Sequence, residues 1–192
     1  MATLILASSS PFRQDILRKL NLKFDSDAPD IDEQRKDNEP AADMVQRLAE
    51  NKARAVANRH PDALIIGSDQ VAVLDDTILG KPHSHENAVR QLRAASGKRV
   101  TFLTGLCLYN SASEHSQVSC VPFTVYFRTL NDEQIERYLQ QDQPYNSAGS
   151  FKSEGLGITL FEKLEGDDPN TLIGLPVIEL VRMLANEGVQ VP

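Results

Sequence analysis

The stretch "LILASSSPFRQDILRKL", residues 4–20, joins an apolar run to a helical pattern through three serines and a proline. Residues 3–7 have the composition of a buried strand, and residues 11–20 favour a helix. Ser10 stands at the N-cap position and Pro11 at the first helical position, where these residue types are preferred. The chain therefore opens with a strand, a tight corner and a helix, which indicates an α/β fold.

The same corner has the chemistry of an anion site. A helix start leaves backbone N–H groups unpaired, and the helix dipole lies behind them. Phosphate is a common ligand there, and Ser8 and Ser9 add hydroxyl groups. Arg13 is close enough in sequence to reach a phosphate oxygen. The alternative is that Ser10 and Pro11 only cap a helix.

Phe12 has two interpretations. Phe12, Ile16 and Leu20 are spaced four residues apart, so Phe12 could begin the apolar stripe that faces the core. Phe12 also stands at the end of that stripe, beside the candidate phosphate site. The sequence leaves both interpretations open.

The remaining pattern alternates between strands and helices. Strands are expected at 63–74, 99–110, 117–130 and 158–164. Helices are expected at 39–60 with Pro40 in the first turn, at 84–97 between Ser84 and Gly97, at 131–140 with a capping box of Asn131 and Gln134, and from Pro176 onward. We expect one domain over residues 1–192 with a mixed sheet, parallel at first and with an antiparallel hairpin in the middle.

Composition excludes several classes of protein. The net charge is −7, which repels a nucleic-acid polymer but allows a small phosphorylated ligand in a local basic pocket. No apolar run approaches the roughly 20 residues that span a bilayer, and the N-terminal residues lack the basic start of a signal peptide. Cys107 and Cys120 are too few for a disulfide framework and resemble buried hydrophobic residues. We expect a cytoplasmic protein without a membrane partner.

Two charged residues stand in apolar surroundings. Lys52 lies four residues after Leu48 in the apolar stripe of the helix at 39–60. A lysine pointing into a cleft requires an anionic partner, although its amine can also extend to solvent. Asp69 ends the apolar run "IIGS", where a carboxylate commonly binds a metal or activates water. The alternative for Asp69 is a surface turn.

Two loops carry further candidates. Lys81 stands in the tight turn "LGKP", which presents its cation rigidly. The segment "APDIDE", residues 28–33, places Asp30, Asp32 and Glu33 in a proline-bounded loop. Such a loop is usually only a solvated acidic segment.

In chain order, "LASSSPFR", "DIDE", "AENKA", "IIGSDQV", "GKP", "TGLCL" and "GSFKSEGLGITLFEKLEGDDPNTLIGLP" together resemble the Maf family of nucleoside triphosphate pyrophosphatases. The resemblance covers essentially the whole chain. It implies an elongated, two-lobed α/β fold with a central cleft, related to that of the inosine triphosphate pyrophosphatases. It also makes a homodimer plausible.

The resemblance implies hydrolysis of the α–β phosphoanhydride of a nucleotide. In this reaction we expect Asp69 to act as the base, directly or with help from a divalent metal, Mg²⁺ or Mn²⁺, that it binds. By family position, Glu33 is the further carboxylate at that metal. The implied phosphate ligands are Ser8, Ser10, Arg13, Lys52 and Lys81.

One departure from the family pattern bears on the substrate. Many members carry Ser-x-Ser-Pro-Arg-Arg, whereas this chain has Phe12 in place of the first arginine. With Gln70 and Glu154, this resembles the subfamily that hydrolyses 7-methyl-GTP. A methylated guanine is cationic, which suits an aromatic face, and a carboxylate can accept from its N1–H and amino group. The alternatives are dTTP or UTP as substrate, or a regulator of cell division that binds nucleotide without turnover.

Overall fold

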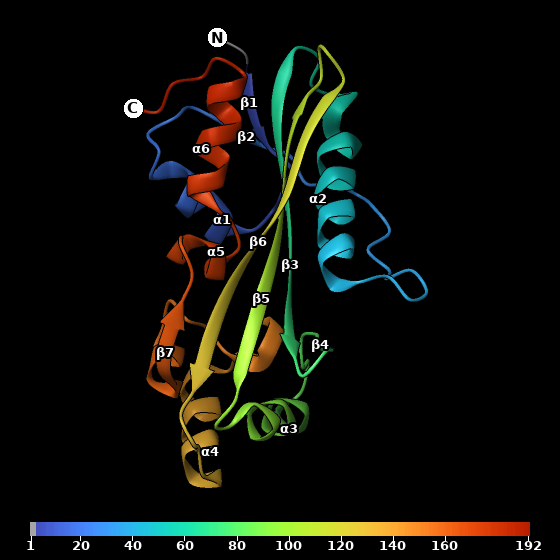
Figure 1. The fold of residues 1–192 in the computed structure, drawn as a ribbon. Coiled ribbons are helices and arrows are strands. Elements are labelled where there is room, and N and C mark those ends of the chain that lie inside the picture. Colours follow the sequence, from blue (N-terminus) through green and yellow to red (C-terminus); the bar gives the residue numbers. More distant parts are fainter. Residues whose placement is uncertain (1–2) are drawn as a thin grey trace. The chain divides into compact units, whose positions relative to one another are not determined.

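The structure is a computed structural model that describes residues 3–192 (Figure 1). Its strands are β1 (Thr3–Leu6), β2 (Asp25–Ser26), β3 (Ala63–Leu74), β4 (Thr77–Leu79), β5 (Arg99–Asn110), β6 (His115–Phe127) and β7 (Phe161–Glu165). Its α-helices are α1 (Pro11–Arg18), α2 (Ala41–Ala57), α3 (His85–Ala95), α4 (Asp132–Asp142), α5 (Pro169–Ile173) and α6 (Val177–Asn186). Two short 3-10 helices are η1 (Ala148–Ser150) and η2 (Leu156–Leu160).

The strands form one mixed sheet of seven, in the order β2-β1-β3-β5-β6-β7, with β4 paired to β3. Strand β1 runs parallel to both β2 and β3. The pairs β3–β4 and β6–β7 are antiparallel. This confirms the α/β class and the mixed sheet with parallel pairing in its early part.

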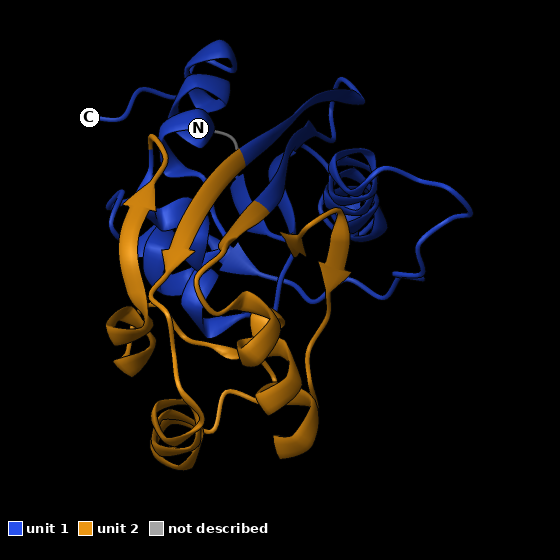
Figure 2. Cartoon of the chain, turned by 60° about the horizontal axis from the view of Figure 1, so that its bottom comes forward, with its two compact units in different colours: residues 1–70, 103–121, 168–192 blue, residues 71–102, 122–167 orange. Residues whose placement is uncertain are grey.

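The chain divides into two compact units (Figure 2). Unit 1 consists of residues 1–70, 103–121 and 168–192, and unit 2 consists of residues 71–102 and 122–167. Strands β3, β5 and β6 contribute residues to both units. The expectation of one domain over residues 1–192 stays a prediction.

Unit 1 has three layers, because successive strand residues point to opposite faces of the sheet. On one face, Leu4, Leu6 and Leu64 pack against residues of α1 and α6. On the other face, Ile5 and Ile65 pack against the alanines of α2. Figure 1 shows the same arrangement, with α1, α5 and α6 on one side of β1 and α2 on the other.

Unit 2 is built around an aromatic cluster. The rings of Phe102, Phe127, Phe151 and Phe161 meet in edge-to-face pairs, with centroids 4.9–5.5 Å apart. Such pairs add to the energy of apolar burial. Phe151 lies just before the loop that carries Glu154, so the cluster fixes the start of that loop.

The local signals in the sequence place most elements correctly. Strands β3 and β5 occupy the predicted residues, and the Asn131–Gln134 capping box is formed in both directions. Pro40 is the N-cap of α2 rather than a residue of its first turn. The strand predicted at 158–164 is wrong at its start, because residues 156–160 form η2 and β7 begins at Phe161.

Two expectations from composition can also be compared with the structure. Cys107 is fully buried in the core of unit 1, and burial raises the pKa of its thiol to about 12. Cys120 is half-buried, and burial raises the pKa of its thiol as well. Of the helices within residues 3–192, none has the length and apolarity needed to cross a membrane.

Candidate active site

The corner between β1 and α1 has the predicted capping geometry. The Ser10 hydroxyl accepts a hydrogen bond from the Arg13 N–H at 3.4 Å, and the Ser8 hydroxyl accepts one from the Ser10 N–H at 3.1 Å. Within residues 3–192, the N–H groups of Ser9 and Phe12 have no backbone acceptor. The corner therefore keeps donors at a helix start, as an anion site requires.

Arg13 is held by the carbonyl group of Gly174. Its Nε donates to that oxygen at 2.9 Å, and the Ser68 hydroxyl donates to the same oxygen at 2.9 Å. Gly174 has a φ of 119°, and a side chain there would bring a Cβ within 3.3 Å of the arginine Nε. Desolvation lowers the pKa of Arg13, while the nearby carboxylates of Asp69 and Glu33 act in the opposite direction. The guanidinium is therefore fixed in a partly desolvated position close to two carboxylates.

Lys52 lies between those two acids. Its Nζ is 2.7 Å from Asp69 Oδ1 and 3.1 Å from Glu33 Oε1. Lys52 is 7% exposed and Asp69 is 8% exposed, so this pair is buried. The prediction that Lys52 has an anionic partner is confirmed, and the alternatives of an amine in solvent and an aspartate in a surface turn are wrong.

Two glycines allow α2 to approach the sheet closely enough for this contact. A Cβ on Gly67 of β3 would lie 2.0 Å from the Ala49 carbonyl oxygen of α2. A Cβ on Gly105 of β5 would lie 2.0 Å from the Val45 carbonyl oxygen. Real atoms cannot come so close, so only glycine fits at both positions. The helix that carries Lys52 therefore rests directly on the backbone of the sheet.

The side chain of Gln70 has a structural task of its own. Its Nε2 donates to the Thr104 hydroxyl at 2.8 Å and to the Thr171 carbonyl at 2.7 Å. The Thr104 hydroxyl donates to that same carbonyl at 3.1 Å. The amide nitrogen is thus used in binding α5 to β3 and β5, which leaves the Oε1 atom for any contact with a ligand.

Phe12 is not part of the core. Its exposed fraction is 46%, whereas Ile16, one turn further along α1, is 2% exposed. The interpretation of Phe12 as the first residue of the core stripe is therefore wrong. The exposed phenyl ring is consistent with the second interpretation, in which Phe12 lies beside the candidate phosphate site at the β1–α1 corner.

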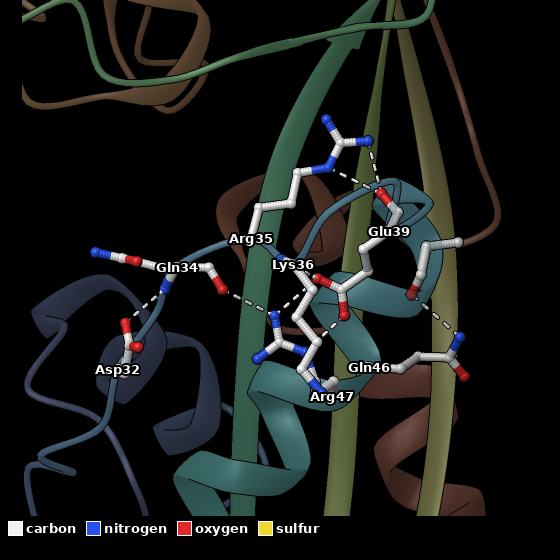
Figure 3. Close-up of polar contacts among 8 residues, drawn as sticks. Asp32, Gln34, Arg35, Lys36, Glu39, Gln46 and Arg47 are labelled. Carbon is white, nitrogen blue, oxygen red and sulfur yellow. Dashed lines mark hydrogen bonds and ion pairs between the residues drawn. The ribbon is translucent and has the colours of Figure 1, made fainter.

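Glu33 stands on the loop before α2, and an ion pair between Glu39 of that loop and Arg47 of the helix ties the two together (Figure 3). Arg47 of α2 contacts both carboxylate oxygens of Glu39, at 2.6 and 2.8 Å. The same guanidinium donates to the Gln34 carbonyl at 3.0 Å. Hydrogen bonds from Arg47 are the main reason that the pKa of Glu39 is lowered to about 2. The acidic side chains of Asp30, Asp32 and Glu33 are exposed, as expected of a solvated loop, while Glu39 and Gln34 attach the loop to α2.

Two predicted site residues, Lys81 and Glu154, belong to unit 2. Lys81 is exposed and has no ion pair or hydrogen bond from its amine to other residues of the range 3–192. It lines a surface cavity of about 320 Å³, whose other lining residues are Leu79, Pro82, Asn87, Arg90, Gln91 and Ala94. Residues 80–83 form no turn, so the tight turn predicted at "LGKP" is wrong. The exposed ammonium of Lys81 is still available to an anionic ligand such as phosphate.

Glu154 is exposed at the tip of a short closed loop. The N–H groups of Gly155 and Gly157 both donate to the Lys152 carbonyl, at 3.3 and 3.1 Å. A Cβ on Gly157 would lie 2.3 Å from that oxygen, so the loop requires glycine there. The Lys152 amine donates to the Asp142 carbonyl at the end of α4, at 2.8 Å. The loop therefore holds its lysine inward and presents Glu154 to solvent.

The segment after β7 is the part of the site that the sequence reasoning missed. Asp168 is 3% exposed and accepts hydrogen bonds from the N–H of Asn170, at 2.8 Å, and of Ile178, at 2.9 Å. It therefore caps α5 and ties α6 to it, which places Gly174 beneath Arg13. The available signal was the pattern "DPNTLIG", an N-cap, a proline and a terminating glycine.

The acidic residues of the site suit a metal that is shared with a substrate. Within residues 3–192, no group of three or more acidic, histidine or cysteine side chains could hold a metal by itself. Asp69 and Glu33 converge on a single cation, the amine of Lys52. Mg²⁺ is commonly bound by one or two carboxylates together with substrate phosphates, so this pair fits such an ion.

The chain is similar to known proteins over nearly its whole length. The family described as "Maf-like protein" matches residues 3–187. A protein of Alcanivorax borkumensis named 7-methyl-GTP pyrophosphatase is 62% identical over 190 residues, which are 99% of this chain and 96% of that protein. A protein of Pseudomonas aeruginosa with the same name is 58% identical over 192 residues, all of both chains.

Among solved structures, protein VC0702 from Vibrio cholerae aligns with 73% of this chain and 70% of its own, at 14% identity and a TM-score of 0.36. The family match and the two relatives carry the assignment. The family match spans residues 3–187, which contain every position of the site, and the two relatives align over 99–100% of this chain. The chain belongs to the Maf family.

Proposed function

We propose that this chain hydrolyses the α–β phosphoanhydride of 7-methyl-GTP and releases 7-methyl-GMP and pyrophosphate. The names of the two relatives support the substrate, because they align over 96–100% of their own length. The observation that carries the chemistry is the contact of Lys52 with Asp69 and Glu33, with Arg13 held nearby. A buried base among cations is what phosphoanhydride hydrolysis requires.

In the proposed reaction, water forms a new P–O bond as the bridging α–β P–O bond breaks. Asp69 takes the proton of the attacking water. Arg13 and Lys52 neutralise the phosphate oxygens and the charge of the departing pyrophosphate. The hydroxyl groups of Ser8 and Ser10 and the free amine of Lys81 complete the phosphate contacts, since the N–H groups of these two serines already donate to Leu6 and Ser8.

A divalent cation, Mg²⁺ or Mn²⁺, is part of this proposal. Glu33 and Asp69 would hold it together with phosphate oxygens, as their converging carboxylates suggest. When bound, such an ion supplies neutralisation of phosphate charge and polarises a bound water. The task of Lys52 in this setting is to keep a positive charge beside both carboxylates.

Three residues are proposed to select the nucleobase of the substrate. Phe12 offers an exposed ring to the cationic, methylated guanine, a contact worth about 0.5–2 kcal/mol. Glu154 offers a carboxylate that can accept from N1–H and the amino group of guanine. Gln70 contributes its Oε1 atom, since its Nε2 is already bonded within the protein.

The test is pyrophosphate release from 7-methyl-GTP, GTP, dTTP and UTP, with Mg²⁺ and with Mn²⁺. We expect a strong preference for 7-methyl-GTP and a loss of about 10²–10⁴-fold in kcat for Asp69→Asn. Asp43→Asn, an exposed aspartate on α2, is the matched control and should keep wild-type activity.

The other outcomes separate the alternatives. A preference for dTTP or UTP would keep the chemistry and overturn the roles of Phe12, Gln70 and Glu154. Absence of turnover for every nucleotide, with binding retained, would favour a nucleotide-binding regulator of cell division. Full activity of Asp69→Asn would overturn the role of Asp69 as base.

Further parts of the proposal come from the sequence. The family resemblance implies the elongated two-lobed architecture with a central cleft and a homodimer, and the composition predicts a cytoplasmic location. A small-molecule nucleotide is the proposed ligand, and no nucleic-acid polymer or membrane is expected, in keeping with the net charge of −7.

A further inference from the structure

The exposed side chain of Glu33 is held in place by few contacts of its own. It stands in the irregular segment 27–40 between β2 and α2, and its side chain is 60% exposed. Its ion pair with Lys52 is a single contact at 3.1 Å. An exposed side chain on a loop loses conformational entropy when it is fixed, and one such contact stabilises it little. A carboxylate that must meet a metal or phosphate at a defined place requires further support.

Arg47 supplies that support from α2 (Figure 3). Its Nε and Nη2 atoms bind the two carboxylate oxygens of Glu39, at 2.6 and 2.8 Å. The side chain of Arg47 is 19% exposed and that of Glu39 is 9% exposed, so the pair is shielded from solvent. A bidentate arginine–carboxylate pair fixes orientation as well as distance.

The arginine also contacts the backbone next to Glu33. Its Nη2 donates to the carbonyl oxygen of Gln34, the following residue, at 3.0 Å. Lys52, which binds the carboxylate of Glu33, stands on the same helix five residues later. One helix therefore contacts this segment at two places, the side chain of Glu33 and the carbonyl group of the next residue.

Glu39 closes the segment on itself. Its carbonyl oxygen accepts from Arg35 Nε and Nη2 at 2.8 and 2.6 Å, and its carboxylate accepts from the Lys36 N–H at 3.1 Å. The pKa of Arg47 is raised first by its hydrogen bond to Glu39 and also by the charge of Asp69. The strongest interaction of Arg47 is therefore its bond to Glu39, which holds the loop.

We propose that Arg47 is a positioning residue for Glu33. Through the carboxylate of Glu39 and the carbonyl of Gln34, it holds the loop so that the Glu33 carboxylate faces Lys52 and Asp69. As far as the reaction is concerned, this inference rests on the proposed function.

The experiment compares Arg47→Ala and Arg47→Lys with Arg54→Ala. Arg54 is a matched control because it also stands on α2 and binds a carboxylate, that of Glu50, and the hydroxyl of Ser116. The first readout is the Mn²⁺ concentration that gives half-maximal pyrophosphate release from 7-methyl-GTP. Arg47→Ala should raise it about 10-fold or more, the effect typical of losing the support of a metal ligand. Arg47→Lys, which cannot bind a carboxylate bidentately, should give a half-maximal Mn²⁺ concentration between those of the wild type and Arg47→Ala. Arg54→Ala should match the wild type.

A double variant separates positioning from general loss of stability. In a Glu33→Gln background, Arg47→Ala should raise the half-maximal Mn²⁺ concentration less than twofold, because the carboxylate to be positioned is gone. An equal effect in both backgrounds would overturn the inference. So would wild-type metal dependence in both Arg47→Ala and Arg47→Lys.

A second readout needs no substrate. Hydrogen exchange of the Lys36 and Glu39 amides, both bonded inside the loop, should be faster in Arg47→Ala and unchanged in Arg54→Ala. Unchanged exchange in Arg47→Ala would overturn the inference that Arg47 holds the loop, even if the enzyme is active. If the wild type hydrolyses no nucleotide, the proposed function fails. Hydrogen exchange still tests whether Arg47 holds the loop in place.

Discussion

Asp69 and Glu33 bind the same amine but are held in opposite ways. Asp69 ends a buried stretch of β3 and is 8% exposed, with Gly67 two residues before it in contact with α2. Glu33 stands on an irregular loop with a side chain that is 60% exposed. The first carboxylate is positioned by close packing of backbone, the second by ion pairs around Glu39 and Arg47.

The difference suggests a division of tasks. A group that takes a proton from water must keep one orientation, and packed interiors allow few others. A carboxylate that shares a cation with a substrate is better placed on a segment that can adjust, because loops are less stable locally than core strands. The ion pairs limit that adjustment without burying the loop.

The largest effect is expected from removing the shared amine. Lys52→Met leaves Asp69 buried without a partner, and breaking a buried ion pair costs about 3–5 kcal/mol of unfolding free energy. Urea unfolding measures this loss. Activity should fall as well, because the cation beside both carboxylates is gone.

Second variants in that background sharpen the comparison. Adding Asp69→Asn to Lys52→Met should restore much of the unfolding free energy, because the uncompensated buried charge disappears. Adding Glu33→Gln should restore little, because that carboxylate is already solvated. Equal recovery by the two would show that the carboxylates are not held differently.

An intermediate effect is expected at the close contact between helix and strand. Gly67→Ala forces a methyl group against the Ala49 carbonyl and should lower the unfolding free energy by about 1–3 kcal/mol or more. Gly80→Ala is the matched control, since no atom lies within 4 Å of its Cβ position. Thermal and urea unfolding of the two variants compare them directly, and similar stability would contradict the packing argument.

The smallest effect is expected from the ion pairs of the loop, and it depends on pH. The pKa of Glu39 is about 2 in the folded protein, below its ordinary value of 4.5. Its contribution to stability is therefore present above pH 4.5 and is lost as the pH falls toward 2. Glu39→Gln should consequently show a smaller drop in melting temperature between pH 7 and pH 3 than the wild type. An identical drop in both proteins would indicate that the pair does not couple to folding.

Local sequence patterns predicted much of the fold for a simple reason. Caps, glycine stops and apolar periodicity act between residues a few positions apart, as at Ser10, Ser84 and the Asn131–Gln134 box. The prediction failed at residues 158–160, where a strand-like composition forms the helix η2. There the loop closed by the carbonyl of Lys152 overrides the local preference.

By itself, the sequence determined the α/β class and the capped serine corner, and it marked Lys52 as a cation in an apolar stripe. The tertiary structure decided which carboxylates meet that amine, because Lys52, Asp69 and Glu33 come from a helix, a strand and a loop. It also decided that Gly67 and Gly105 are close-contact positions and that Gly174 holds Arg13. Local order depends on neighbours along the chain, whereas these contacts exist only after α2, β3, β5 and α5 have packed together.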